Sequence, residues 1–307
     1  MPAPRVASLI ASSTEIVCAL GFADLLVARS HECDYPEFVK TLPQITAPKI
    51  DADVSSARID RQVRDIVRAG LSVYRVDAEA LREVDPNVIV TQDHCEVCAV
   101  STKDLEAAVC NWLDSSVRVV SLTPNSLTDI FGDIAKVASA LGAPNRAERL
   151  IAAMRARIAA VRDRAAAART QPRVAFIEWI EPLMGGGNWM PELIAAANAT
   201  DVLGRAGEHS GWIQFEALSD ADPDVIIIAP CGLDVPRTLI EMPPLVQHAG
   251  WQQLRAVRNG RVFVADGNAY FNRPGPRVVD SVEILGEIIH PEIFRFAEHR
   301  HAWRAVA

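Results

Sequence analysis

The chain has 307 residues, of which half are hydrophobic, and a formal net charge of −8 at pH 7. This length allows two domains, each with a core of its own. The acidic balance and the dispersed basic residues argue against nucleic acid or anionic lipid as a partner, and the absence of a long apolar run argues against membrane insertion.

Strand and helix patterns alternate in the first part of the chain. We expect strands at residues 5–10, 25–29, 72–75, 88–91 and 117–122. We expect helices from residue 13 and at residues 57–69, 78–84 and 102–114, with Ser12 or Ser13 capping the first of them. Such alternation predicts a parallel sheet wrapped by helices.

The stretch from Pro144 to Gln171 predicts one long helix. Pro144 suits a first turn, the interior consists of good helix formers, and Pro172 ends the helix. Its expected apolar stripe consists of Leu150, Ile151, Met154, Ile158 and Val161. At 1.5 Å per residue such a helix reaches about 38 Å, enough to join two lobes.

The chain after this helix repeats the first plan. We expect strands at residues 174–177, 225–229 and 262–265, a helix from Pro191 to about Asn198, and a closing helix that ends near Ile289.

A short sequence pattern occurs once on each side of the long helix. Glu79-Ala80-Leu81, Asp85-Pro86 and Val88-Ile89-Val90 return at the same spacing as Glu216-Ala217-Leu218, Asp222-Pro223 and Val225-Ile226-Ile227. Arg5-Val6-Ala7 likewise returns as Arg173-Val174-Ala175. Chance similarity between two common βα units is one explanation. We favour the other: two similar α/β lobes (residues 1–124 and 172–307) bridged by a helical region (residues 125–171).

Most candidates for ligand contact lie in loops that follow predicted strands. Ligands of open α/β sheets collect beyond the carboxyl ends of the strands, so two facing lobes would form one cleft there. The loops are residues 11–15, 31–36, 91–98, 178–189, 230–235 and 266–277, and their aromatic residues are Tyr35, Trp179, Trp189, Tyr270 and Phe271. Flat aromatic walls suit a large, partly apolar ligand, although rings can also fill the base of a loop.

Cys95 and Cys98 form the sharpest local motif, a Cys-x-x-Cys pair. Two thiolates at this spacing can bind a soft metal, with His31, Cys33, His94 and Cys231 as candidates to complete the site. A thioredoxin-like redox pair and two thiols packed at a loop base are the other interpretations.

No residue pattern predicts an enzyme. Ser12 and Ser13 lack the G-x-S-x-G context, and His209 beside Ser210 is not a triad. The remaining histidines, His248, His290, His299 and His301, are expected at the surface or in packing. The first residues lack the pattern of a secretory signal, and six cysteines are too few for a disulfide framework, so we expect a cytoplasmic protein with free thiols.

Four stretches, in the same order, resemble the vitamin B12 and iron-siderophore class of ABC-transporter substrate-binding proteins. They are RVASLIASSTEIVCALGFADLLVARSHECDYP, VDAEALREVDPNVIVTQDHCEVC, FEALSDADPDVIIIAPCG and DGNAYFNRPGPRVVD, and they are most similar to the cobalamin-binding branch. The resemblance implies two α/β lobes bridged by one helix, with the ligand between the lobes. It also implies an ABC-transporter permease as partner, which family members contact through one exposed Glu per lobe. By position these are Glu79 and Glu216.

We therefore expect a binding protein for cobalamin, a related corrinoid or another metal chelate. The alternative is a cytosolic metal-binding or thiol-redox protein that uses Cys95 and Cys98 on the same fold. The candidate ligand-binding residues are Ser12, Ser13, His31, Asp34, Tyr35, Gln92, Asp93, Cys95, Cys98, Trp179, Trp189, Trp212, Cys231, Tyr270, Phe271 and Arg273. The candidate ligands of a bound metal ion are Cys95, Cys98, Cys33 and His31.

Overall fold

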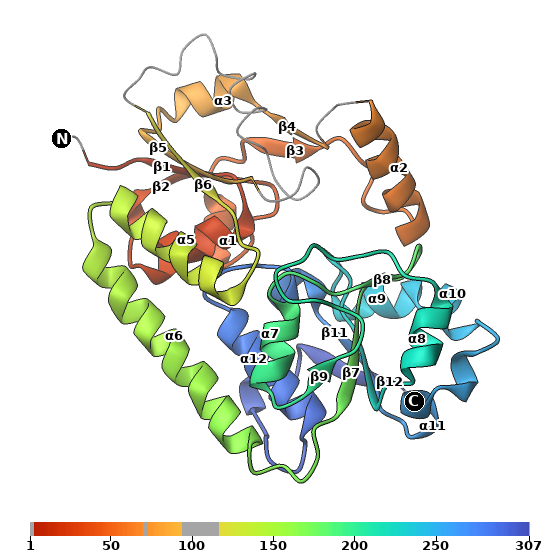
Figure 1. Ribbon diagram of the computed structural model, residues 1–307. Coiled ribbons are helices and arrows are strands. Elements are labelled where there is room, and N and C mark those ends of the chain that lie inside the picture. The colour runs from red at the N-terminus through yellow and green to blue at the C-terminus, as the bar shows by residue number, and fades with distance from the viewer. Residues whose placement is uncertain (1–2, 70–72, 94–116, 307) are drawn as a thin grey trace. The chain divides into compact units, whose positions relative to one another are not determined.

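The computed structural model describes residues 3–69, 73–93 and 117–306 (Figure 1). The chain divides into two compact units. Unit 1 consists of Met1–Val54, Arg61–Pro124 and Thr128–Ala153, and unit 2 of Ser55–Asp60, Asn125–Leu127 and Met154–Ala307. The predicted helix at residues 102–114 lies outside the described residues.

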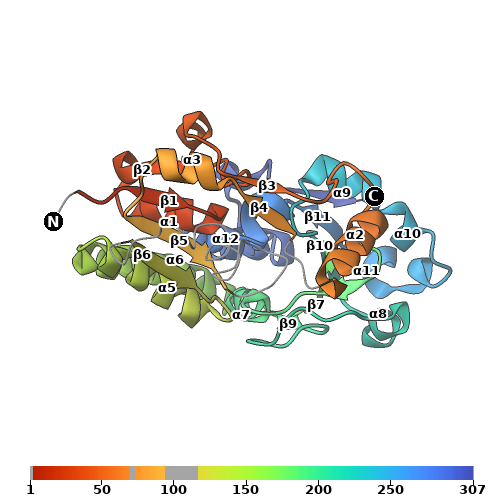
Figure 2. The same ribbon diagram turned by 90° about the horizontal axis from the view of Figure 1, so that it is seen from above.

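Unit 1 contains a four-stranded parallel sheet in the order β2–β1–β5–β6 (Figure 2). Its strands are β1 (Val6–Ser8), β2 (Leu26–Arg29), β5 (Val88–Gln92) and β6 (Arg118–Leu122). Helix α3 (Ala78–Glu83) lies on one face, and α1 (Ala11–Ala19) and α5 (Leu127–Ala140) lie on the other (Figure 1). All five residues of β5 are buried because both faces of the strand are covered.

The smaller elements of the first part of the chain are an antiparallel pair, one helix and two single turns. They are β3 (Thr46–Pro48), β4 (Tyr74–Val76), α2 (Ser56–Arg68), η1 (Ala23–Leu25) and η2 (Glu37–Thr41). Helix α2 is divided between the two units after Asp60.

Unit 2 contains a six-stranded sheet in the order β12–β11–β10–β7–β8, with β9 beside β7. The central strands β7 (Arg173–Trp179), β10 (Val225–Ile228) and β11 (Val262–Ala265) are parallel. Strand β9 (Thr200–Asp201) is parallel to β7, whereas β8 (Met184–Gly185) and β12 (Trp303–Val306) are antiparallel to their neighbours. Parallel central sheets in both units confirm the predicted α/β class.

The helices of unit 2 cover both faces of this sheet (Figure 1). Helices α7 (Met190–Ala196) and α12 (Val278–Ile289) lie on one face. The other face packs on Leu218 of α8 (Phe215–Ala221), on Leu245 of α10 (Pro243–Val246) and on Ala256 of α11 (Arg255–Arg258). The remaining elements are α9 (Val235–Glu241), η3 (Trp251–Gln253), the π-helical turn η4 (Gly267–Phe271) and η5 (Ala297–His299).

The repeat seen in the sequence is also a repeat in strand pairing. In unit 1, Val6 pairs with Val88 and Ala7 with Ile89, and in unit 2, Val174 pairs with Val225 and Ala175 with Ile226. In both units, the strand that begins in the repeated Arg-Val-Ala motif pairs with the strand that follows the repeated Asp-Pro motif, and the register is the same.

In each unit, an arginine at the start of the first paired strand bonds the segment that leads into the second. The backbone N–H of Arg5 donates to Asn87 Oδ1 at 2.8 Å, and that of Arg173 donates to Asp224 Oδ2 at 2.9 Å. Each guanidinium also donates to a carbonyl at the end of α3 or α8, at 2.6 and 2.8 Å respectively. The two copies therefore share backbone pairing and side-chain fastening, which makes chance similarity a poor explanation.

The long helix exists but is shorter than predicted. Helix α6 spans Pro144–Ala165, so it ends six residues before Gln171, and the unit boundary falls between Ala153 and Met154. Of the predicted stripe, Met154 and Val161 are buried and the other members are partly buried. At this end the helix tightens into a turn: Ala165 O accepts from Ala168 N–H at 2.9 Å and from Asn198 Nδ2 at 3.0 Å.

The predicted cap of the first helix was wrong. Helix α1 begins at Ala11, its N-cap residue is Ile10, and no side chain caps it. Ser13 lies inside the first turn, where its hydroxyl donates back to Ile10 O at 2.9 Å. The apolar run of the strand continues directly into the helix, so the polar residues mark the first turn rather than its start.

Asn198 performs two tasks that substitutions can separate. Its backbone has φ = 54°, a left-handed conformation that terminates α7, and its side chain bonds the end of α6. Asn198→Gly keeps the backbone freedom and loses the bond, which costs about 1 kcal/mol. Asn198→Ala also meets the left-handed penalty of about 1–2 kcal/mol. Thermal unfolding should rank wild type above Gly and Gly above Ala; equal stability of the two variants would contradict this assignment.

Candidate functional site

A cluster of buried hydroxyl groups lies where β1 enters α1. Ser8 Oγ and Ser13 Oγ are 2.6 Å apart, and Thr14 Oγ1 lies 2.6 Å from Ser8 Oγ and 3.0 Å from Cys33 Sγ. All four side chains are buried. Ser13 and Cys33 are therefore part of the interior packing of unit 1, with the Cys33 thiol against hydroxyl groups.

Ser12 lies in the first turn of α1, just after β1, and Gln92 is the last residue of β5, the strand beside β1. Both side chains are buried, and neither Ser12 Oγ nor Gln92 Oε1 has a hydrogen-bond partner among the described residues. Buried polar atoms in folded proteins are normally paired, so this strand edge holds more hydrogen-bonding capacity than the fold itself uses.

His31 is a neutral imidazole at physiological pH. Burial, followed by the charge of Arg29, lowers the pKa of His31 to about 4. Its Nδ1 lies 2.7 Å from Thr46 Oγ1, and its Nε2 lies 3.9 Å from Glu32 Oε1. Because the ring is uncharged, the contact with Glu32 is not an ion pair at neutral pH. The neutral form with one nitrogen held by a hydroxyl is the form that binds metals.

Other predicted residues of unit 1 reach the surface. Tyr35 is 49% exposed, Asp93 is also exposed, and Asp34 is partly buried. Phe38, which the sequence did not single out, is likewise exposed in the turn that follows Tyr35. The candidate residues Cys95 and Cys98 lie outside the described residues, as does His94.

The predicted aromatic residues of unit 2 are mostly buried. Trp189 Nε1 donates to Phe271 O at 3.1 Å, and the Phe271 ring packs on Phe176 with centroids 5.5 Å apart. Trp179 Nε1 donates to Glu181 O at 3.2 Å, within its own loop. Tyr270 is also buried, and its hydroxyl lies 3.1 Å from His301 Nε2. These four rings hold the loops at the strand ends together.

Three further candidates of unit 2 lie near the same strand ends. Trp212 is 55% exposed and pairs with Met184, which in turn pairs with Trp179 at the end of β7. Cys231 is exposed, and its backbone N–H donates to Glu178 O at 3.2 Å. Arg273 is buried and donates to Asn268 Oδ1 at 3.2 Å. The structure therefore brings the loops after β7, β10 and β11 together.

Glu79 and Glu216 occupy equivalent positions in the two units. Each is exposed and is the second residue of a short helix, α3 or α8. Two positions later stand Leu81 and Leu218, both fully buried. Each helix is thus held by its leucine while its glutamate faces solvent.

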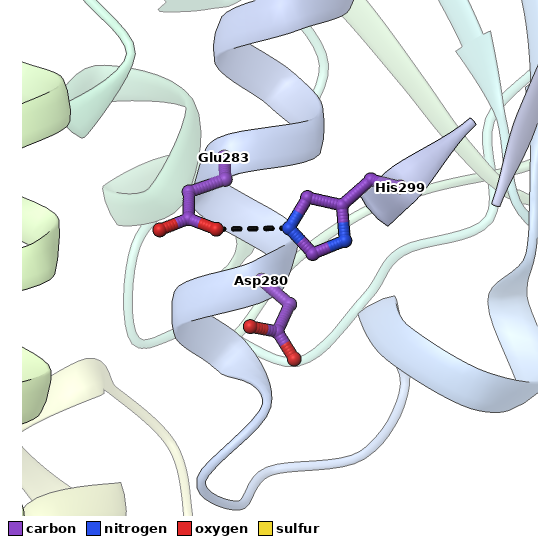
Figure 3. Close-up of side chains that lie close together, drawn as sticks. All are labelled: Asp280, Glu283 and His299. Carbon is purple, nitrogen blue, oxygen red and sulfur yellow. Dashed lines mark hydrogen bonds and ion pairs between the residues drawn. The ribbon is translucent and has the colours of Figure 1, made fainter. Parts of the chain in front are cut away.

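Sequence reasoning missed one group of charged residues. Asp280, Glu283 and His299 bring their ligand-type atoms within 4.8 Å of one another (Figure 3). The Arg157 guanidinium contacts both carboxylates, at 2.6 and 2.7 Å. The i, i+3 spacing of two acidic residues on one helix was a visible signal, but only folding shows what neutralises them.

The sequence of residues 6–269 matches the family model described as periplasmic binding protein. The chain belongs to this family. The predicted relationship to substrate-binding proteins is thereby confirmed, and members of the family are binding proteins. A relative in Bacillus subtilis, an uncharacterized ABC transporter substrate-binding lipoprotein, is 23% identical over 300 residues, which cover 95% of this chain and 81% of that protein.

Solved structures of other binding proteins share the fold. A heme-binding protein of Pseudomonas aeruginosa has a TM-score of 0.72 at 22% identity, covering 96% of this chain and 95% of its own. A heme-binding protein of Roseiflexus has a TM-score of 0.68 at 24% identity, covering 94% and 98%. The vitamin B12 binding protein of Vibrio cholerae has a TM-score of 0.65 at 19% identity, covering 94% and 97%. At these identities the likeness establishes the two-lobe fold.

The predicted cytoplasmic location was wrong. The family is one of periplasmic binding proteins, and the Bacillus subtilis relative is a lipoprotein. The prediction relied on the lack of a secretory pattern in the first residues, which does not decide the compartment. Among the described residues, no helix combines the length and apolar character needed to cross a membrane.

The pKa of His31 gives a test of this site. Its folded value lies below the unfolded value of 6.5, so protons bind more tightly to the unfolded chain, and stability should fall as the pH drops from 6.5 towards 4. NMR titration of the ring should give a pKa near 4, and His31→Gln should remove this part of the acid sensitivity. Thr46→Val should leave the pKa low because burial is the main cause; a wild-type value near 6.5 would contradict the assignment.

Proposed function

We propose that the protein is the substrate-binding component of an ABC transporter and that its ligand is a flat metal chelate, a corrinoid or a heme. Family membership supports small-molecule binding, and the Bacillus subtilis relative supports association with a transporter. The observation that carries the ligand class is the pair of exposed aromatic rings at the strand-end loops, Tyr35 in unit 1 and Trp212 in unit 2.

An exposed aromatic ring on an anchored loop is suited to stacking. Trp212 is tied to Met184 by strand-like pairing, so its loop has a defined position while its ring remains half exposed. Stacking of a flat ligand on such a ring contributes about 0.5–1.5 kcal/mol beyond the burial of apolar area. The neighbours named for binding heme and vitamin B12 support a flat tetrapyrrole, and the sequence resemblance favours a corrinoid first.

The metal of such a chelate would find a suitable ligand in His31. Its ring is neutral at physiological pH, and Nε2 is the nitrogen that Thr46 leaves available. The hydroxyl oxygen of Tyr35, four residues later in the same loop, is a second candidate ligand for the metal. The alternative function, a metal-binding or thiol-redox protein, is based on Cys95 and Cys98, which lie outside the described residues.

Titration of the purified protein tests the ligand class. Cyanocobalamin, hemin and a ferric hydroxamate are added separately, and binding is followed by absorbance and by quenching of tryptophan fluorescence. One of the two ring chelates should bind with a stoichiometry of one, more tightly than the hydroxamate. Preference for the hydroxamate would reject a flat ligand while leaving transporter association open.

Variants of the two rings belong to the same test. Tyr35→Ala and Trp212→Ala should each weaken binding about tenfold or more, equivalent to about 1.4 kcal/mol. Ile240→Ala is the matched control, because Ile240 is 71% exposed and lies on α9 rather than in an aromatic loop. Tyr35→Phe separates the ring from the hydroxyl: retained affinity indicates stacking, and lost affinity indicates contact with the metal.

We further propose that Glu79 and Glu216 dock on the permease. Glu79→Lys and Glu216→Lys should abolish ligand uptake in cells that carry the cognate transporter, because each reverses a charge at the contact, and both should leave ligand affinity unchanged. Glu83→Lys and Asp220→Lys, exposed positions on the same two helices, are the controls and should retain uptake. Equal loss in all four variants would point to a general effect of charge instead.

A further inference from the structure

Two acidic residues on one helix require a positive partner. Asp280 and Glu283 are separated by three residues on α12, so their side chains lie on the same side of the helix. The Glu283 side chain is only 10% exposed, and an unpaired carboxylate there would be costly.

Two cations from different parts of unit 2 supply the partners. Arg157 of α6 donates to both oxygens of Glu283, at 3.0 and 2.7 Å, and to Asp280 Oδ1 at 2.6 Å. His299 Nε2 lies 2.8 Å from Glu283 Oε2, an oxygen that Arg157 also contacts (Figure 3). Glu283 thus joins α6, α12 and the segment that leads to the C-terminal strand.

The charges balance only when His299 is protonated. Two carboxylates and one guanidinium leave a net negative charge, which an imidazolium cancels. The same guanidinium nitrogen, Arg157 Nη2, contacts both carboxylates, at 2.6 and 2.7 Å, so with a protonated His299 the cluster is neutral without a metal ion.

We propose that Arg157, Asp280, Glu283 and His299 form a pH-sensitive latch that fastens the C-terminal segment and the second half of α6 to α12. The latch is closed while His299 carries its proton and weakens when the proton is lost. It does not rest on the proposed ligand, since each of its contacts lies within unit 2.

The neighbouring groups agree with this assignment. Although burial alone would lower the pKa of His299, the hydrogen bond that His299 donates to Glu283 and the charges of Asp280, Glu283 and Glu298 raise it above the ordinary value. Burial alone would raise the pKa of Glu283, but His299 and Arg157 together lower it. The remaining faces of His299 meet the rings of Tyr270 and Phe296.

Other charged groups near the segment have partners of their own. Glu287 accepts bonds from Phe296 N–H and Trp303 Nε1, at 3.1 and 3.2 Å. His301 contacts the hydroxyl of Tyr270, and the Arg277 guanidinium lies over that ring, 5.3 Å from its centroid. The Arg164 guanidinium lies over Phe294 and Phe296. His299 is accordingly the group through which a rise in pH acts on this contact.

The direction of the pH effect follows from the two shifts. A raised pKa means that the contribution of His299 is complete below the unfolded value of 6.5 and is lost as the pH rises through its folded value. A lowered pKa means that the contribution of Glu283 is complete above 4.5 and is lost as the pH falls through its folded value. The latch is therefore complete between about pH 4.5 and 6.5 and loosens on the alkaline side first.

NMR titration of the full chain tests the latch directly. The His299 ring should titrate above 6.5. Glu283→Gln should bring its pKa below 6.5, because burial then acts unopposed, whereas Arg157→Met should raise it further by removing a neighbouring cation. If His299 only filled space, the two variants would not shift its pKa in opposite directions. A His299 pKa at or below 6.5 in the wild type would overturn the proposal.

Stability and hydrogen exchange provide the second test. Wild type should melt about 2–4 °C above His299→Gln at pH 5.5 and lose this advantage by pH 8.5. His248→Gln, a change of an exposed ring stacked on Phe215, is the control and should follow the wild-type profile. In the wild type, hydrogen exchange of the backbone amides of residues 296–306 should accelerate between pH 5.5 and 8.5 by more than the intrinsic pH dependence of amide exchange. Parallel profiles for wild type and His299→Gln, or stabilisation of the wild type by stoichiometric Zn²⁺, would contradict the latch.

Discussion

The pairing of two parallel strands, β1 with β5 and β7 with β10, is the constraint on which each unit depends. Parallel neighbours must be joined by a crossover, so a fixed register between them also places the helix before the second strand. Arg5 and Arg173 secure that register from the same end in both units. The loops at the opposite ends of the strands do not set this register, so their residues can vary without disturbing the sheet.

The architecture could be read from the sequence because it is written in local patterns. Apolar runs identified the central strands, and Pro144 marked the start of α6. The Glu-Ala-Leu patterns that contain Leu81 and Leu218, each followed at the same spacing by Asp-Pro, identified the repeated helices. The end of α6 was predicted six residues too late, and its contact with Asn198, a residue distant in the sequence, was not visible in the local pattern. Strand β12 was missed for the same reason: a short edge strand is defined by the neighbour it meets.

The candidate site was predictable in its loops but not in the exposure of their side chains. An aromatic residue in a loop can contact a ligand or can pack in the base of the loop, and the sequence does not distinguish the two. The structure separates them, with Phe271 and Trp189 packed inside unit 2 and Tyr35 and Trp212 at the surface. His299 shows the converse, because an apparently scattered histidine acquires its chemistry from Glu283, which only the fold brings close.

The last strand has a consequence for handling the protein. Strand β12 pairs antiparallel with β11 over Val262–Ala265, four buried residues at what would otherwise be the open edge of the sheet. An uncovered edge of this kind is a template for pairing with another chain. Truncation before Trp303, or a fusion that pulls the C-terminus away, would expose the edge of β11 to pairing with another chain. Tags and surface attachments for this protein therefore belong at the other end of the chain.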